Sequence, residues 1–127
     1  MAEHGEFHWN ELLTTDPGGA KTFYAAITGW TFSEMPMPDG MTYHVAMRGD
    51  AHAGGIMKMP DAMPEGTPPH WFAYLAVDDV DAAAGKAGDA GGSVLTPPFD
   101  VEGVGRIAII QDPQGAALGL ITPAAQG

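Results

Sequence analysis

The chain has 127 residues, a length typical of one domain that can bury a hydrophobic core. Its formal net charge is −11, and an acidic surface repels nucleic acid and anionic membranes, so we expect neither as a partner. The absence of cysteine excludes disulfides, thiolate catalysis and cysteine-bound metals. No signal-peptide pattern and no apolar run near a membrane-spanning length is present, so we expect a cytoplasmic protein.

The first half of the chain predicts a strand, a helix and three more strands. Asp16 is a good N-cap and Pro17 suits a first helical position, and apolar residues then recur at helical spacing. We therefore expect a helix at about 17–28, closed by Gly29. The other expected elements are strands over 7–14, within 28–35, over 41–48 and over 54–59, a turn at 36–40 and a hairpin turn at 48–54.

The second half repeats this order after a linker at 60–69, which contains four prolines and a glycine. Asp78 or Asp79 caps the second helix, and Gly91–Gly92 end it. Pro97–Pro98 are expected to stop the short strand that follows. The remaining expected elements are strands over 71–77, 105–110 and 116–122 and a tight turn at 112–115.

The two halves form an internal repeat. A shift of 63 positions places Asp16 on Asp79 and Pro60 on Pro123 without a gap. A half of about 60 residues is marginally stable alone, so we expect both to pair into one α+β sheet with the helices outside. The prediction is a single domain over 1–127, with module one at 7–60, the linker at 60–69 and module two at 70–123.

Several stretches resemble the vicinal-oxygen-chelate superfamily, which contains glyoxalase I, bleomycin-resistance proteins and extradiol dioxygenases. They are ELLTTDPGGAKTFYAAITGW in the first half, and YLAVDDVDAA, AGGSVL and GRIAIIQDPQGAALGLITP in the second. The resemblance covers nearly the whole chain. It implies two tandem βαβββ modules that form a curved eight-stranded mixed sheet with helices on the outer face. It also implies a small organic molecule bound in a cavity between the modules.

In metal-dependent members of that superfamily, each module supplies one metal ligand from its first strand and one from its last. Carried over by the resemblance, these positions are Trp9, Phe72, Gly119 and, within about one residue, Ile56. None of these side chains binds a metal. Because glyoxalase I and the dioxygenases need a divalent ion, the resemblance implies a member without the metal centre, and we expect no cofactor.

Strand alternation separates the polar residues of the first strand. If Trp9 faces the cavity, Glu11 shares its face and His8 does not, so His8 and Glu11 cannot hold one ion together. A carboxylate on an apolar wall must be paired, hydrogen-bonded or kept protonated. The partners that we consider for Glu11 are Tyr74, His70 and Arg106.

Two interpretations of Glu11 stay open. It is either a general base or acceptor for a ligand, or half of a structural pair that joins the modules. The 63-position repeat places Glu11 opposite Tyr74 and matches Arg106 with Tyr43, so both of these are expected on the cavity face. The candidate catalytic residues are Glu11, Tyr74 and His70, and the candidate ligand-binding residues are Trp9, Tyr43, Phe72 and Arg106.

Three functions follow as alternatives. The first is a metal-free enzyme of the glyoxalase-like lyase or isomerase class that uses Glu11 for acid–base chemistry. The second is a protein that sequesters a drug or metabolite without turnover. The third is a divalent-metal-dependent lyase or dioxygenase with shifted ligands such as His70, Glu11 or His44. We expect a homodimer, in which the modules pair within one chain or swap between chains.

Overall fold

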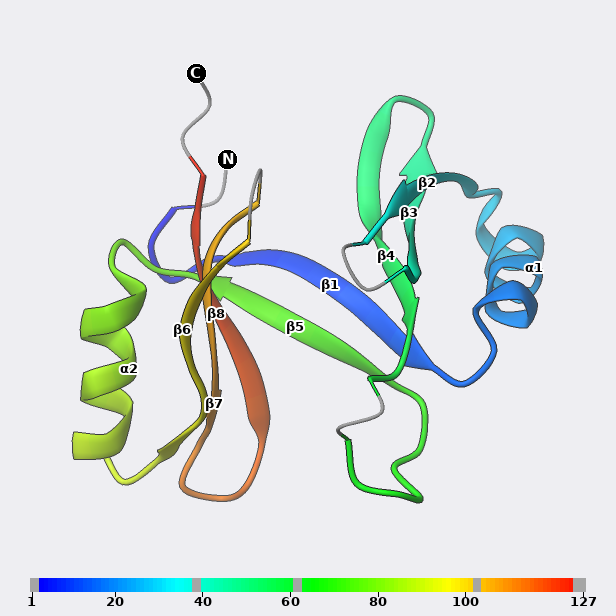
Figure 1. The fold of residues 1–127 in the computed structure, drawn as a ribbon. Coiled ribbons are helices and arrows are strands. Elements are labelled where there is room, and N and C mark those ends of the chain that lie inside the picture. The colour runs from blue at the N-terminus through cyan, green and yellow to red at the C-terminus, as the bar shows by residue number, and fades with distance from the viewer. Residues whose placement is uncertain (1–2, 38–39, 61–62, 102–103, 125–127) are drawn as a thin grey trace. The chain divides into compact units, whose positions relative to one another are not determined.

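The computed structural model describes residues 3–37, 40–60, 63–101 and 104–124. These residues form two helices and eight strands in two successive βαβββ modules (Figure 1). The strands follow the order β2-β3-β4-β1-β5-β8-β7-β6, and both parallel and antiparallel pairs occur. The expected α+β class with an eight-stranded mixed sheet is confirmed.

The chain divides into two compact units. The first unit is Asn10–Trp71, and the second unit is Met1–Trp9 together with Phe72–Gly127. Strand β1 runs from the second unit into the first, and β5 begins in the first unit and continues in the second. The expectation of a single domain stays a prediction.

The first unit carries most of the first module. Its β4 pairs parallel with β1 and antiparallel with β3, which in turn pairs antiparallel with β2. The module consists of β1 (Phe7–Thr14), α1 (Pro17–Thr28), β2 (Thr31–Pro36), β3 (Thr42–Arg48) and β4 (Ala51–Lys58).

Helix α1 begins and ends as its sequence predicts. The carboxylate of Asp16 accepts a hydrogen bond from the amide of Gly19 at 3.0 Å, and Pro17 occupies the first turn. Gly29 ends the helix in the left-handed conformation, with φ of 78°, which glycine adopts without a side-chain penalty. No residue of α1 is buried.

The second unit carries the second module. Its β8 pairs parallel with β5 and antiparallel with β7, which pairs antiparallel with β6. The N-terminal segment adds to this unit, because Gly5 donates from its amide to the carbonyl of Ala76 at 2.8 Å. The module consists of β5 (His70–Ala76), α2 (Val80–Asp89), β6 (Ser93–Val101), β7 (Gly105–Gln111) and β8 (Ala117–Pro123).

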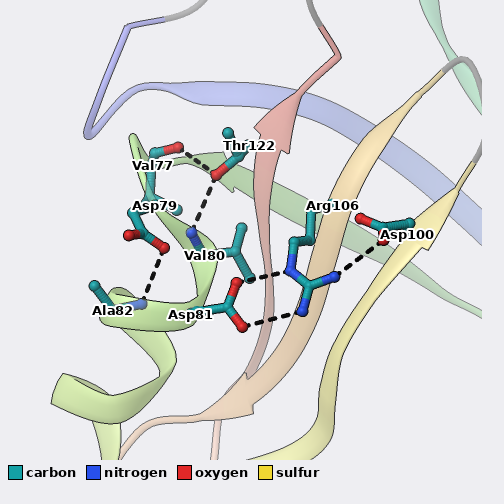
Figure 2. Close-up of polar contacts among 8 residues, drawn as sticks. All are labelled: Val77, Asp79, Val80, Asp81, Ala82, Asp100, Arg106 and Thr122. Carbon is teal, nitrogen blue, oxygen red and sulfur yellow. Dashed lines mark hydrogen bonds and ion pairs between the residues drawn. The ribbon is translucent and has the colours of Figure 1, made fainter.

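Helix α2 packs against β6, β7 and β8 (Figure 1). Of the two predicted caps, Asp79 is the one used, and its carboxylate accepts from the amide of Ala82 at 3.2 Å. The hydroxyl of Thr122 accepts from the amide of Val80 at 3.1 Å and donates to the carbonyl of Val77 at 2.9 Å, which fixes the start of α2 to β8 (Figure 2). The core beneath the helix contains Val77, Val80, Ala84, Ala108 and Leu120.

Two strand boundaries differ from the prediction by more than one residue. Strand β6 continues through Pro97–Pro98, because within its unit it pairs with β7 alone and its register shifts between Thr96 and Phe99, where a residue need not donate to the ladder. Strand β4 begins at Ala51, because Gly49 turns the hairpin within two residues. The predicted turn at 36–40 and linker at 60–69 each include two residues outside the described part of the chain.

The buried face of the first module predicts a stability test. Ile56 is fully buried in β4 and pairs with Leu12. We expect Ile56→Ala to lower the free energy of unfolding by about 2–5 kcal/mol, because the change leaves a cavity. Urea denaturation measures this loss. The matched control is Ile27→Ala on α1, where the side chain is 63% exposed and the expected change is within about 0.5 kcal/mol. Equal effects of the two variants would contradict this account of the core.

Candidate functional site

One face of the first unit carries the candidate chemistry. Glu11 on β1 lies opposite Gly55 on β4, and Gly55 lies opposite Val45 on β3. Residues opposite one another on neighbouring strands point to the same face, and so do residues two apart along one strand. Tyr43, two residues before Val45, is therefore on the same face as Glu11 and Gly55.

Tyr43 and Glu11 are joined by a hydrogen bond. The Tyr43 hydroxyl donates to Oε1 of Glu11 at 2.8 Å, and Glu11 is only 8% exposed. Between the two strands lies Gly55, where a Cβ atom would overlap the hydroxyl and ring of Tyr43. The ring thus crosses β4 above a glycine to reach β1. Such a bond stabilises a carboxylate that burial has removed from water.

His44 lies on the opposite face of β3, because it pairs with Ile56. Burial lowers the pKa of His44, Lys21 on α1 lowers it further, and Glu34 raises it. The His44 Nδ1 atom is 3.9 Å from Oε2 of Glu34 and has no hydrogen-bond partner among the described residues. His44 thus points away from Glu11, so these two residues cannot hold one metal ion together.

The second unit brings two predicted residues together. The rings of Phe72 and Tyr74 meet edge to face, with centroids 5.2 Å apart and planes at 77°. Tyr74 lies opposite Gly119, where a Cβ atom would overlap the Tyr74 ring. Phe72 is buried and Tyr74 is half-buried. Trp9, also half-buried, belongs to the same unit.

Arg106 does not lie where the sequence placed it. Its guanidinium forms a two-point ion pair with Asp81 on α2, with Nε–Oδ2 at 2.7 Å and Nη2–Oδ1 at 3.0 Å, and contacts Asp100 at 3.1 Å (Figure 2). This pairing lowers the pKa of Asp81 and raises that of Arg106. Ala108, two residues later on β7, is in the core beneath α2. Arg106 therefore faces the helix, and its predicted place on the face of Tyr43's counterpart is wrong.

The error comes from the irregular pairing of β6 with β7. Tyr43 pairs with Met35, and the equivalent pair in the second module is Ile107 with Phe99, 64 positions later rather than 63. The shifts of register in β6 add the extra position, and a slip of one residue reverses the face of every side chain beyond it. Ile107, not Arg106, is thus the counterpart of Tyr43.

The same slip corrects the last-strand position of the first module. Glu11 lies opposite Gly55 as Tyr74 lies opposite Gly119, so the counterpart of Gly119 is Gly55 and not Ile56. The four ligand positions that the resemblance implies are then Trp9, Phe72, Gly55 and Gly119. No group of three or more His, Asp or Glu side chains suited to a metal ion lies within the described ranges. The four implied ligand positions therefore do not fit a divalent metal.

The sequence missed the partner of Glu11 that the first unit provides. From the sequence we considered Tyr74, His70 and Arg106 as partners, whereas Tyr43 makes the described bond. Nδ1 of His70 lies 2.9 Å from the carbonyl oxygen of Pro68, at the start of β5. A signal for the contact was present, because a glycine within a strand often marks a close approach of another group.

Neither helix in the described part of the chain is long and apolar enough to cross a membrane. The lengths of α1 and α2 are 12 and 10 residues. The cytoplasmic location and the homodimer stay predictions.

His44 predicts a dependence of stability on pH. Its pKa is lowered from 6.5 in the folded chain, so the unfolded chain binds the proton at higher pH. The contribution of neutral His44 to the free energy of unfolding is therefore fully present above about pH 6.5 and is lost as the pH drops toward the pKa of His44 in the folded chain. We expect His44→Leu to remove part of this loss, measured as the difference in Tm between about pH 7.5 and about pH 5.5. An equal difference in both proteins would exclude His44 as a cause.

The chain is similar in sequence to known proteins. The chain is 49% identical over 124 residues to "Putative glyoxylase CFP32" of Mycobacterium tuberculosis, a match that covers 98% of the chain and 46% of that protein. It is 30% identical over 120 residues to "Anthracycline biosynthesis protein DnrV" of Streptomyces peucetius, covering 86% and 44%. The chain thus spans about half the length of these relatives.

Solved structures share the fold. A Streptomyces coelicolor methylmalonyl-CoA epimerase in complex with 2-nitronate-propionyl-CoA superposes with a TM-score of 0.71 at 19% identity, covering 97% of the chain and all of that protein. The sequence profile of the Glyoxalase/Bleomycin resistance protein/Dioxygenase superfamily matches residues 6–120. The chain belongs to this superfamily.

Proposed function

We propose that this chain binds a small organic molecule and transfers a proton on it with Glu11 as general base, without a metal. The observation that carries the proposal is the buried carboxylate of Glu11, held at Oε1 by the Tyr43 hydroxyl at 2.8 Å. A carboxylate removed from water is a stronger acceptor toward a substrate than a hydrated one, and its orientation is fixed in advance. The four ligand positions that the resemblance implies, Trp9, Phe72, Gly55 and Gly119, carry no metal-binding side chain, so the proposal relies on acid–base chemistry.

The two residues have separate roles in this proposal. Glu11 takes a proton from an acidic C–H or O–H group of the substrate and returns it to a neighbouring atom, which is the balance of an isomerase step. Tyr43 touches the carboxylate and orients it, since its hydroxyl donates to Oε1.

The similar proteins support a small organic ligand. Among them are a protein named as a glyoxylase, a protein of anthracycline biosynthesis and an epimerase that holds a CoA ester. Trp9 and Phe72 stay predicted as ligand-binding residues, and within their own unit the rings of Phe72 and Tyr74 meet edge to face. Tyr74 and His70 stay predicted as further acid–base groups.

Sequestration without turnover is the second candidate function. It is favoured by the exposure of Glu11, which at 8% leaves little room for a substrate to approach without a change in side-chain positions. In that case, the ligand does not need to reach Glu11, which keeps its bond to Tyr43 and transfers no proton. The signature is thermal stabilisation by the ligand with no product.

Glu11→Gln tests the proposed chemistry. We expect the amide to lower proton transfer by a factor of about 100 or more, because it cannot act as a base, while Tm stays nearly unchanged. The assay is mass-spectrometric uptake of deuterium from D₂O into methylmalonyl-CoA and into the hemithioacetal of methylglyoxal and a thiol. The matched control is Glu34→Gln, which changes an exposed carboxylate on β2.

The other outcomes separate the alternatives. A large drop in Tm for Glu11→Gln would favour a structural pair over a catalytic one. Stabilisation of the wild-type chain by either compound without deuterium uptake would favour sequestration. Unchanged uptake in Glu11→Gln would contradict the assignment of the base.

A further inference from the structure

We infer that Gly55 and Gly119 each leave the space that a tyrosine ring occupies, and we call these two positions the seats. We also infer that Gly55 is the positioning residue that lets Tyr43 lie against Glu11. The inference rests on the proposed function only for its consequence in catalysis. The seats themselves are a property of the fold and can be tested without a substrate.

The backbone does not require glycine at either position. The glycines with positive φ in the described residues are at turns, helix ends and strand ends, and Gly55 and Gly119 are not among them. Both lie inside ordinary strands, where any residue can adopt the conformation. What they provide is therefore space rather than backbone freedom.

One tyrosine fills the space at each seat. The three atoms nearest to a Cβ added at residue 55 are all from the Tyr43 side chain, and the three nearest at residue 119 are all from Tyr74. A side chain at either position would thus conflict first with a ring and not with the backbone. By contrast, a Cβ at Gly54 would meet the carbonyl oxygen of Asn10 at 2.9 Å.

The two rings reach their seats by different routes. Tyr74 on β5 lies above Gly119, its direct neighbour on the parallel strand β8. Tyr43 comes from β3, crosses β4 above Gly55 and places its hydroxyl at the carboxylate of Glu11 on β1. The seat at Gly55 therefore controls a polar contact that joins the outer two of three adjacent strands.

This placement has a consequence for the last-strand positions. In each unit the tyrosine ring takes the place where a side chain of residue 55 or 119 would begin. A residue other than glycine at position 55 must displace Tyr43, and the hydroxyl then leaves Oε1 of Glu11. Gly55 thus determines the orientation of the proposed base, although it has no side chain.

A double-mutant cycle tests the seat. Gly55→Ala is expected to lower Tm in the wild-type background and to cost much less in a Tyr43→Ala background, where the ring is gone. The second cycle pairs Gly119→Ala with Tyr74→Ala and has the same expected pattern. The matched control is Gly85→Ala on α2, where an added Cβ meets nothing within 4 Å.

A second readout follows the position of Tyr43. The ¹³Cδ resonance of Glu11 is expected to move in Tyr43→Phe, which removes the hydroxyl alone, and to move in the same direction in Gly55→Ala. Adding Gly55→Ala to Tyr43→Phe should then move it little further. A merely structural role for Gly55 would lower Tm and leave this resonance in place, and Gly85→Ala should not move it.

The outcomes are distinct. If Gly55→Ala alone fails to fold while the double variant with Tyr43→Ala folds, the seat is supported. Equal cost of Gly55→Ala in both backgrounds, or an unmoved Glu11 resonance, would overturn the inference. If the cycles behave as expected and Glu11→Gln still takes up deuterium normally, the seat stands and the proposed function fails.

Discussion

The hydrogen bond from the Tyr43 hydroxyl to the Glu11 carboxylate is the constraint on which the candidate site depends. Glu11 is buried, and an ionised carboxylate without partners is costly away from water. The bond requires β1, β4 and β3 to pair in their observed register, and it requires a glycine where the ring crosses β4. The bond thus depends on three groups from three strands, namely a carboxylate, a phenol and a glycine.

In each module, the two faces of the strands carry different groups of residues. In the second unit, Ala108 and Leu120 pack beneath α2, and Tyr74 lies on the other face above Gly119. In the first unit, Ile56 and His44 lie on one face, and Glu11 and Gly55 lie on the other. Strand alternation produces this division, because a residue that packs under a helix and its neighbour point to opposite sides.

The sequence predicted the elements well because local signals define them. Asp16 with Gly29, and Asp79 with the glycines after α2, fix the helix ends by hydrogen bonding and positive φ, which depend on a few adjacent residues. It also placed Glu11 on the face opposite Leu12, since alternation within one strand needs no knowledge of the partner strand.

The contacts of the site could not be predicted in the same way. Arg106 was misplaced, and Ile56 was named one residue away from Gly55, because the irregular pairing of β6 adds one position to the repeat and no local signal reports the pairing of a bulged strand. The bond between Tyr43 and Glu11 was missed because it depends on the reach of a ring across an intervening strand. Gly55 indicated such an approach without naming the group that makes it.

The most direct test is the coupling free energy between Tyr43→Phe and Glu11→Leu, measured by urea unfolding of both single variants and the double variant. Leucine is used because, unlike the amide of Glu11→Gln, it offers no acceptor to the Tyr43 hydroxyl. If the hydroxyl and the carboxylate form the bond on which the site depends, removing either partner should cost about as much as removing both. The account predicts a coupling of about 1–3 kcal/mol, the range for a hydrogen bond to a buried charged group. Additive effects, with a coupling near zero, would contradict it.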